Sequence, residues 1–192
     1  MTKRIAVLAL ALVTVAGCGS SPKTSFYALS VSPSPAQSPT QAAFPVQVVA
    51  VHVPPMLDRQ EMVRKMTGQS VKLSDTDRWS APFGDMIRNV LSQDLQSRLS
   101  RGSLILPEAP TPQGTASIVV TIADFSADAQ GHIELSGSWS VVSSKTNKPM
   151  LQRTVALSAD GDSDANAVAG SMSRVLGQLA SDIASGLAGV RG

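Results

Sequence analysis

The chain has 192 residues, with 16 basic side chains, 14 acidic side chains and one cysteine. One cysteine excludes an internal disulfide, and a net charge of +2 with few aromatic residues offers neither a basic stripe for nucleic acid nor a surface for stacking sugars. The length suits one ordinary domain that is stabilised by its hydrophobic core alone.

The N-terminus has the pattern of a secretory signal peptide. Lys3 and Arg4 precede an apolar stretch over residues 5–15, which is shorter than the roughly 20 residues that a transmembrane helix needs. The stretch ends in Val15-Ala16-Gly17-Cys18, which resembles the lipobox at which bacterial lipoproteins are cleaved and acylated. We therefore expect a signal peptide over residues 1–17 and lipidation of Cys18. The alternative is that Cys18 is a chance cysteine beside an ordinary signal-peptidase site.

Residues 18–45 are predicted to be a tether, since they are rich in Ser, Thr and Gln and contain five prolines. Only residues 26–31 interrupt this composition, because their alternation of apolar and small side chains predicts an edge strand. If that strand joins the body, about eight residues separate it from the acylated cysteine. At roughly 3.3 Å per residue, the body then stands no more than about 25 Å from the membrane.

The first half of the expected domain, which spans residues 46–192, contains strands and one helix. Residues 46–53 are β-branched and predict a buried strand that Pro54-Pro55 ends, and residues 61–66 and 70–73 predict a hairpin. Apolar residues then recur at helical spacing from Phe83 to Leu99, with Ser80 as the expected N-cap and Gly102 as the stop. The polar face of this helix is expected to be solvated and carries Asp85, Asn89, Ser92, Gln93, Gln96 and Ser100.

The second half is predicted to hold strands at 103–106, 116–125, 132–143 and 150–158, the last three joined by turns as an antiparallel meander. A second helix is expected over residues 163–187, capped by Asp162 or Ser163. This order predicts an α+β fold: a single domain with a largely antiparallel sheet and two amphipathic helices packed on one face.

No set of residues in the sequence favours catalysis or metal binding. His52 and His132 have no second His or Cys at ligand spacing, and neither a nucleophile elbow nor a phosphate-binding loop is present. The acidic turn 160–164 has an incomplete calcium-loop pattern and is better interpreted as a helix cap. The sequence therefore predicts no enzyme, no cofactor and no metal site.

Two polar clusters are candidate docking loops: Leu57-Asp58-Arg59 and Arg78-Trp79. Trp and Arg are enriched in binding hot spots, so these loops could contact a partner. The structural interpretation, which we favour, is that Trp79 anchors the start of the first helix and that Arg78 or Arg59 pairs with neighbouring aspartates. Leu135, Trp139 and Val141 alternate with serines, so Trp139 is predicted to lie in the core.

The predicted C-terminal helix has a second unusual face, opposite its large apolar side chains. That face carries small residues: Gly170, Ser173, Gly177, Ser181, Ala184 and Ala188. It is interpreted either as an interface of a homo-oligomer or as an exposed face of an Ala- and Ser-rich helix. On either interpretation, Gly177→Arg or Ala184→Glu is expected to leave the subunit folded.

Four motifs in order carry a family resemblance: the lipobox, then Phe26-Tyr27-Ala28-Leu29, then Val53-Pro54-Pro55-Met56-Leu57-Asp58-Arg59 with Met62-Val63, then Arg78-Trp79-Ser80-Ala81-Pro82-Phe83. With these motifs the chain resembles the ABC-type transport auxiliary lipoprotein family, which includes lipoproteins of the paraquat-inducible protein C type. Met56 stands where an aromatic residue is expected and Phe83 where leucine is usual, and both replacements are apolar.

The resemblance implies a non-enzymatic lipoprotein that works with a phospholipid transport system of the mammalian-cell-entry (MCE) type. Such a lipoprotein is expected on the periplasmic face of the outer membrane, where it docks or receives the MCE-domain protein. Gly19 after the cysteine, rather than Asp, agrees with this location under the sorting rule of enteric bacteria. Two alternatives stay open: an envelope assembly or structural lipoprotein without lipid transport, and a lipid-binding shuttle.

Overall fold

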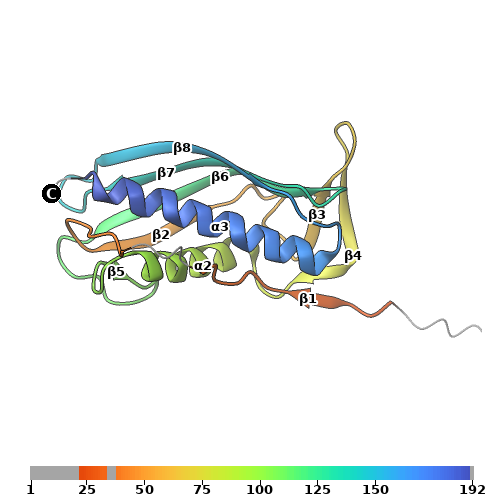
Figure 1. Ribbon diagram of the computed structural model, residues 1–192, viewed down its shortest axis with the longest axis horizontal. Helices are drawn as coiled ribbons and strands as arrows, with labels where there is room; N and C mark the ends of the chain where they lie inside the picture. Colours follow the sequence, from red (N-terminus) through yellow and green to blue (C-terminus); the bar gives the residue numbers. More distant parts are fainter. Residues whose placement is uncertain (1–21, 34–37, 191–192) are drawn as a thin grey trace, which may run out of the picture.

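The computed structural model describes residues 22–33 and 38–190, which form one mixed sheet and two helices (Figure 1). Residues 1–17 and Cys18 lie outside the described residues. The strands are β1 (Ser25–Tyr27), β2 (Val46–His52), β3 (Glu61–Lys65), β4 (Val71–Trp79), β5 (Leu104–Ile105), β6 (Ala116–Asp128), β7 (Ile133–Val142) and β8 (Pro149–Ala159). The helices are α2 (Phe83–Arg98) and α3 (Ala165–Ala188). Neither helix of the described part of the chain has the length and apolar character needed to cross a bilayer.

The sheet is organised around β6. The meander β6-β7-β8 is antiparallel, as the turns between these strands predict. The other edge of β6 is shared: β2 pairs parallel with its first half and β3 pairs parallel with its last residues. β5 extends the sheet beyond β2, and β4 and β1 extend it beyond β3.

The predicted α+β class is confirmed, but the sheet is only partly antiparallel. Among the described residues, four strand pairings are parallel and three are antiparallel. Short turns in the sequence reveal antiparallel neighbours, whereas a parallel pair needs a long crossover connection. The connection from β2 to β6 contains α2, and nothing in the local sequence shows that these two strands become neighbours.

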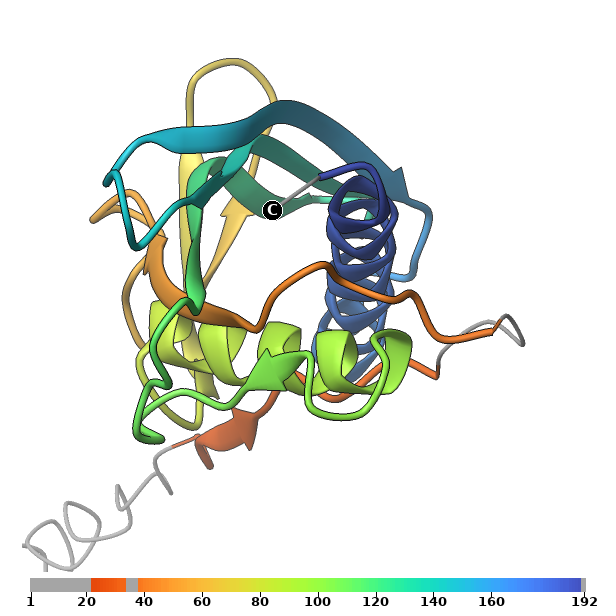
Figure 2. The same cartoon turned by 90° about the vertical axis from the view of Figure 1, so that its left-hand side faces the viewer.

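Both helices cover the same face of the sheet, as predicted, and the curved sheet wraps around them (Figure 2). The core between the layers is built from apolar residues on the inward side of every long strand and on the facing sides of the helices. Its largest fully buried side chains include Trp139, Phe125, Phe83, Leu91 and Leu176. The predicted core position of Trp139 is therefore confirmed.

The helix caps differ from the predicted ones. Pro82, not Ser80, is the N-cap of α2, and because proline has no capping side chain the amide of Gly84 donates instead to Asp58 Oδ1 at 3.0 Å. Asp164 caps α3, since its Oδ1 accepts from the amides of Asn166 and Ala167 at 2.9 and 3.1 Å. The acidic turn 160–164 is thus a helix cap, as interpreted from the sequence.

The described part of the predicted tether packs on the body. β1 is shorter than the predicted strand 26–31 and pairs parallel with the end of β4. Leu29 and Ala42 are buried in the core, and Thr40 bridges to Leu99 at the end of α2. The folded body therefore includes residues on the N-terminal side of residue 46.

Candidate functional site

The two sequence clusters proposed as docking loops meet beside the N-terminus of α2. Trp79 is only 3% exposed and stacks on Phe83, with ring centroids 4.9 Å apart, and Phe83 contacts Phe125 at 5.6 Å. Leu57 is also buried. Trp79 therefore anchors the start of α2, which is the structural interpretation favoured from the sequence, and neither of these two side chains is presented to a partner.

The polar residues of the same clusters are paired within the chain. Asp58 caps α2, while Arg59 Nε lies 3.2 Å and Arg78 Nη1 lies 3.5 Å from opposite oxygens of Glu61. The hydrogen bond from its own backbone amide, followed by the charges of Arg59 and Arg78, holds the pKa of Glu61 below its usual value. Both arginines therefore pair with Glu61 rather than with the neighbouring aspartates, and they stay partly exposed.

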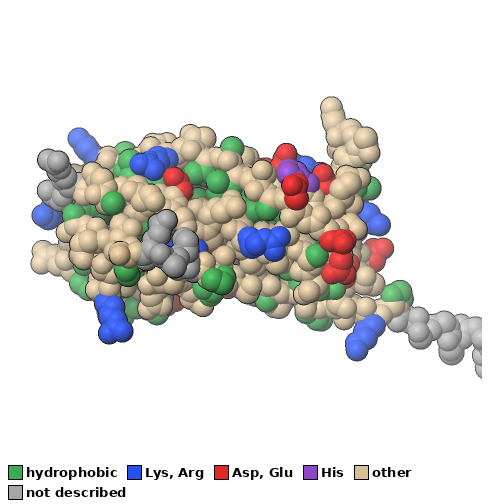
Figure 3. Space-filling view, viewed as in Figure 1, with side chains coloured by type: hydrophobic (Ala, Val, Ile, Leu, Met, Phe, Trp, Pro, Cys, Tyr) green, Lys and Arg blue, Asp and Glu red, His purple; other side chains and the backbone are tan. Residues whose placement is uncertain are grey.

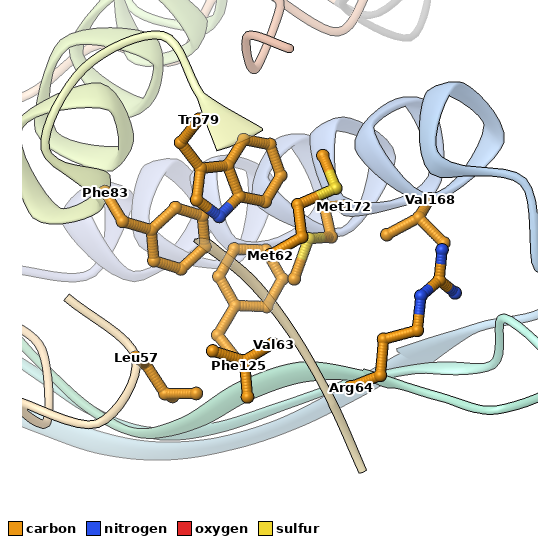
Figure 4. A pocket seen from close by; sticks show the side chains of 9 residues that line it. All are labelled: Leu57, Met62, Val63, Arg64, Trp79, Phe83, Phe125, Val168 and Met172. Carbon is orange, nitrogen blue, oxygen red and sulfur yellow. The ribbon is translucent and has the colours of Figure 1, made fainter. Parts of the chain in front are cut away.

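The hollow between these aromatics and α3 is almost filled (Figure 4). Its volume is about 10 Å³, and its lining side chains come from the 57–64 segment, Trp79, Phe83, Phe125, Val168 and Met172. A volume of roughly 10–15 Å³ holds one water molecule, so no acyl chain fits in this hollow as it stands.

The described residues contain no cluster suited to metal binding. Within residues 22–33 and 38–190, no group of three or more His, Cys, Asp or Glu side chains is close enough to hold a metal ion. His132 Nδ1 lies 2.8 Å from Asp160 Oδ1 on the surface, and His52 lies at the exposed end of β2 without a second His nearby in the sequence.

The most specific polar contacts belong to a segment that follows β1, residues 29–32, which we call the N-terminal strap. Leu29 inserts into the core, the amide of Ser30 donates to Ser173 Oγ at 3.0 Å, and the amide of Ser32 donates to Asp94 Oδ1 at 2.9 Å. Because Ser173 lies on α3 and Asp94 on α2, the strap is held by both helices. In Figure 1 the strap runs from β1 along them.

The strap covers the middle of the small-residue face of α3. Ser173 and Ala184 are each 4% exposed, Gly177 faces Ser32, and Ser181 Oγ accepts from Arg98 Nε at 3.0 Å. The expectation that this face points away from the packed body is therefore wrong for these residues, because α3 packs on both sides. Of the six small residues, only Gly170, Ser181 and Ala188 retain appreciable exposure.

An ion pair at the strap was missed in the sequence. Arg98 Nη1 lies 3.1 Å from Asp94 Oδ1, and the two side chains are 6% and 0% exposed. Burial raises the pKa of Asp94 above its usual value, although the charge of Arg98 and the Ser32 amide oppose this shift. The i, i+4 spacing of an acid and an arginine beside Leu91 and Leu95 is the signal that could have identified the pair. Ser92, assigned to the solvated face, is also buried.

An open pocket of about 330 Å³ lies near the start of β8, at the opposite end of the molecule from β1 (Figure 1). Half-buried Phe44 and exposed Met150 give it an apolar part, and Lys145 adds a cation. Its other lining residues are Ala43, Pro45, Gln113, Gly114, Ala116, Ser143 and Ser144. The pocket is large enough to receive side chains of another protein.

Comparison with known proteins gives one family and several structures. The model of the ABC-type transport auxiliary lipoprotein component matches residues 27–184. The fold is similar to the crystal structure of an uncharacterized protein, with a TM-score of 0.66, 20% identity, and 87% of this chain and 97% of that chain covered. It is also similar to protein XCC0632 from Xanthomonas campestris, with a TM-score of 0.69, 15% identity and coverages of 84% and 93%. No curated protein sequence matches the chain significantly.

Proposed function

Since this chain belongs to the ABC-type transport auxiliary lipoprotein family, we propose that it is an outer-membrane lipoprotein of an MCE-type phospholipid transport system. Acylated Cys18 holds the body at the periplasmic face of the membrane, and the body docks or receives the periplasm-spanning MCE-domain protein. The observation that carries this proposal is the family match over residues 27–184, with a lipobox at residues 15–18 a short distance before it. Several acyl chains on one cysteine give stable anchoring, at about 0.8 kcal/mol per buried CH₂ group.

The packing of the core supports a docking role rather than that of a lipid-binding shuttle. A site for a lipid chain needs a cavity on the order of 300 Å³ or more inside the protein. The hollow between the sheet and the helices has a volume of about 10 Å³ and is lined by closely packed aromatic and aliphatic side chains. The pocket of about 330 Å³ near Met150 is open at the surface and has polar as well as apolar lining, so the body offers its outer surface to the transport system.

The position of the N-terminus favours one end of the body as the docking surface. The chain enters at β1, so the pocket around Phe44 and Met150 lies at the end far from the anchor (Figure 1). In the proposed arrangement this end points into the periplasm, toward the MCE-domain protein. Its lining of apolar side chains and one lysine suits a protein partner.

Photo-crosslinking in cells tests this proposal. A photoreactive residue at Met150, which is 38% exposed, is expected to crosslink to an MCE-domain protein. The same residue at Val71, which is 42% exposed and lies on β4 at the other end, is the matched control and is expected to give no such product. Crosslinking of the Met150 variant to an assembly machine or to peptidoglycan-bound proteins would instead favour an assembly or structural lipoprotein.

We further propose that the body forms a homo-oligomer around the end of the lipid path. The buried middle of the small-residue face of α3 excludes Ser173, Gly177 and Ala184 from such an interface in the folded subunit. Light scattering of the purified lipoprotein is expected to give a mass of several subunits, and a monomer at high concentration would contradict this expectation.

A further inference from the structure

The surface next to the anchor carries an unusually exposed aromatic side chain. Phe26 on β1 is 62% exposed, the highest exposure among the large hydrophobic side chains of the described residues. Its neighbour Tyr27 is half-buried and donates from its hydroxyl group to Asp77 Oδ1 at 3.3 Å, so the two side chains of this edge strand have different surroundings. The described residues therefore leave most of the Phe26 side chain uncovered.

The strand beside Phe26 places an arginine on the same face of the sheet. Phe26 is the register partner of Arg78, and Arg78 is in turn the partner of Glu61. Register partners lie side by side on one face of a sheet. Glu61 is paired with both Arg59 and Arg78, and exposed Lys23 stands three residues before Phe26 in the chain. Asp77, the register partner of Ser25, adds a second carboxylate to this edge, so basic and acidic side chains are both present there.

The space-filling view agrees with this composition. Figure 3 shows hydrophobic and basic side chains close to the point where the chain leaves the body beside β1, with acidic side chains on the neighbouring surface. An exposed aromatic ring with arginine and lysine side chains nearby suits the interface of an anionic bilayer, since the ring enters the head-group region and the cations contact the lipid phosphates.

The length of chain before β1 identifies the occupant of this surface. Phe26 stands eight positions after Cys18, so at roughly 3.3 Å per residue Phe26 stays within about 26 Å of the acylated cysteine. Acylation at Cys18 fixes that residue at the membrane surface. The bilayer that receives the acyl chains is therefore the apolar and anionic surface within reach.

We propose that the β1 end of the body rests on the bilayer that holds the acyl chains, with the Phe26 ring in the membrane interface and Lys23, Arg59 and Arg78 against anionic head groups. This inference rests on the anchoring part of the proposed function. The contact sets the orientation of the body, because a second attachment point beside the acyl chains stops it from rotating freely on its tether. The pocket near Met150 is then directed away from the membrane.

The test uses tryptophan fluorescence and the single cysteine. The mature chain is coupled through Cys18 to maleimide-bearing lipid in phosphatidylcholine and phosphatidylglycerol vesicles, with or without bromine on the acyl chains. Trp79 and Trp139 are only 3% and 1% exposed, so their emission is expected to be the same in every variant. The emission of the wild-type chain therefore gives the background to subtract. Phe26→Trp is expected to lose roughly half of the added emission to the brominated lipid, because an interfacial ring lies at the acyl boundary.

Two matched variants determine the outcome. Met150→Trp reports on the far end and Leu73→Trp on the β3-β4 hairpin, and both replaced side chains are similarly exposed at 38% and 37%. The proposal expects quenching of Phe26→Trp and none of the other two. Equal quenching of all three, no quenching of Phe26→Trp, or quenching of Leu73→Trp alone would each overturn it. Coupling through maleimide does not require acylation in the cell, so this result is independent of whether Cys18 is the natural lipidation site.

Discussion

At the scale of single residues, Asp94 is the carboxylate that joins the N-terminal strap to the helices. Its Oδ1 accepts from the Ser32 amide and from Arg98 Nη1, while its Oδ2 is buried without a hydrogen-bond partner among the described residues. A buried donor that loses its acceptor costs about 1–3 kcal/mol. Asp94 therefore matters mainly as an acceptor for two buried donors.

The substitution Asp94→Ala is expected to lower the free energy of unfolding by about 2 kcal/mol, because the Ser32 amide and Arg98 lose a shared acceptor. Asp94→Asn keeps an acceptor oxygen and is expected to cost less. Urea unfolding of the mature chain measures both effects. Asp85→Asn is the control on the same helix: Asp85 is 63% exposed and lies 4.0 Å from Arg88, so the change is expected to stay within about 0.5 kcal/mol. An equal loss for the two Asp94 variants would contradict the acceptor role.

The pH dependence of stability follows from the raised pKa of Asp94. Between the usual value of 3.8 and the raised value, the folded state binds more protons at this group than the unfolded state does. The contribution of Asp94 to stability is therefore greatest below pH 3.8 and falls as the pH rises through the folded-state pKa. Wild type is expected to gain stability relative to Asp94→Asn as the pH is lowered from neutral toward 3.8, measured by urea unfolding of both proteins. If wild type instead loses stability relative to Asp94→Asn as the pH is lowered, the charge of Arg98 has a larger effect on the pKa of Asp94 than burial has.

At the scale of elements, α3 is packed along two sides. Its large apolar side chains enter the core, while its small residues admit the strap and the Arg98 side chain. Gly186 shows the same use of small residues on another side, because a Cβ there would collide with the Trp139 ring. The absence of charged side chains along most of this helix thus reflects contacts within the chain.

A pair of glycine substitutions tests the packing of the strap. A Cβ at Gly177 would lie 2.5 Å from Ser32 Cβ and 3.1 Å from Arg98 Nη2, so Gly177→Ala is expected to cost about 1–3 kcal/mol in thermal or urea unfolding. A Cβ at Gly170 would meet no atom within 4 Å, so Gly170→Ala is expected to stabilise the helix by about 0.5–1 kcal/mol. If Gly177→Ala and Gly170→Ala change the free energy of unfolding equally, the strap is not closely packed against α3 at Gly177.

The same geometry changes the expectation for larger substitutions. Gly177→Arg and Ala184→Glu were expected to leave the subunit folded, but Gly177 faces Ser32 and Ala184 is buried. Both variants are now expected to destabilise the subunit, so a loss of oligomer in either would not identify an interface.

At the scale of the whole molecule, the chain enters at one end, and the open pocket lies at the other (Figure 1). The strap and β1 attach the first described residues to both helices and to the sheet. In the proposed arrangement, an anchor at Cys18 would act on this end of the body through a short connection, and it would limit both the height and the orientation of the pocket above the membrane.

Replacement of the single cysteine tests this arrangement in cells. Cys18→Ala is expected to abolish incorporation of labelled fatty acid and to block cleavage after residue 17, because no other thiol is available in the chain. Metabolic labelling and mass spectrometry of the N-terminus measure the two effects. An unmodified N-terminus elsewhere in the wild-type protein would remove the basis for the short connection to the membrane.

The sequence by itself determined the features that depend on local pattern. Periodicity located both helices, the alternation around Trp139 identified a core strand, and turn residues predicted the meander of β6, β7 and β8. The acidic turn was correctly assigned to a helix N-terminus because carboxylates near backbone amides are stabilised within a few residues. The family was recognisable from the order of its motifs, since the resemblance does not require any distance in space.

Only the tertiary structure decided which distant segments meet. The parallel pairs of β6 with β2 and β3, the strap between α2 and α3, and the burial of Asp94 all join residues far apart in the chain. A polar residue beside an apolar stripe has the same local pattern whether water or a strap covers it, so Asp94 and Ser92 were indistinguishable from the solvated face. Small residues likewise permit close approach without specifying what approaches. The physical reason is that burial depends on the partner that packs against a surface, and that partner is determined by the whole chain.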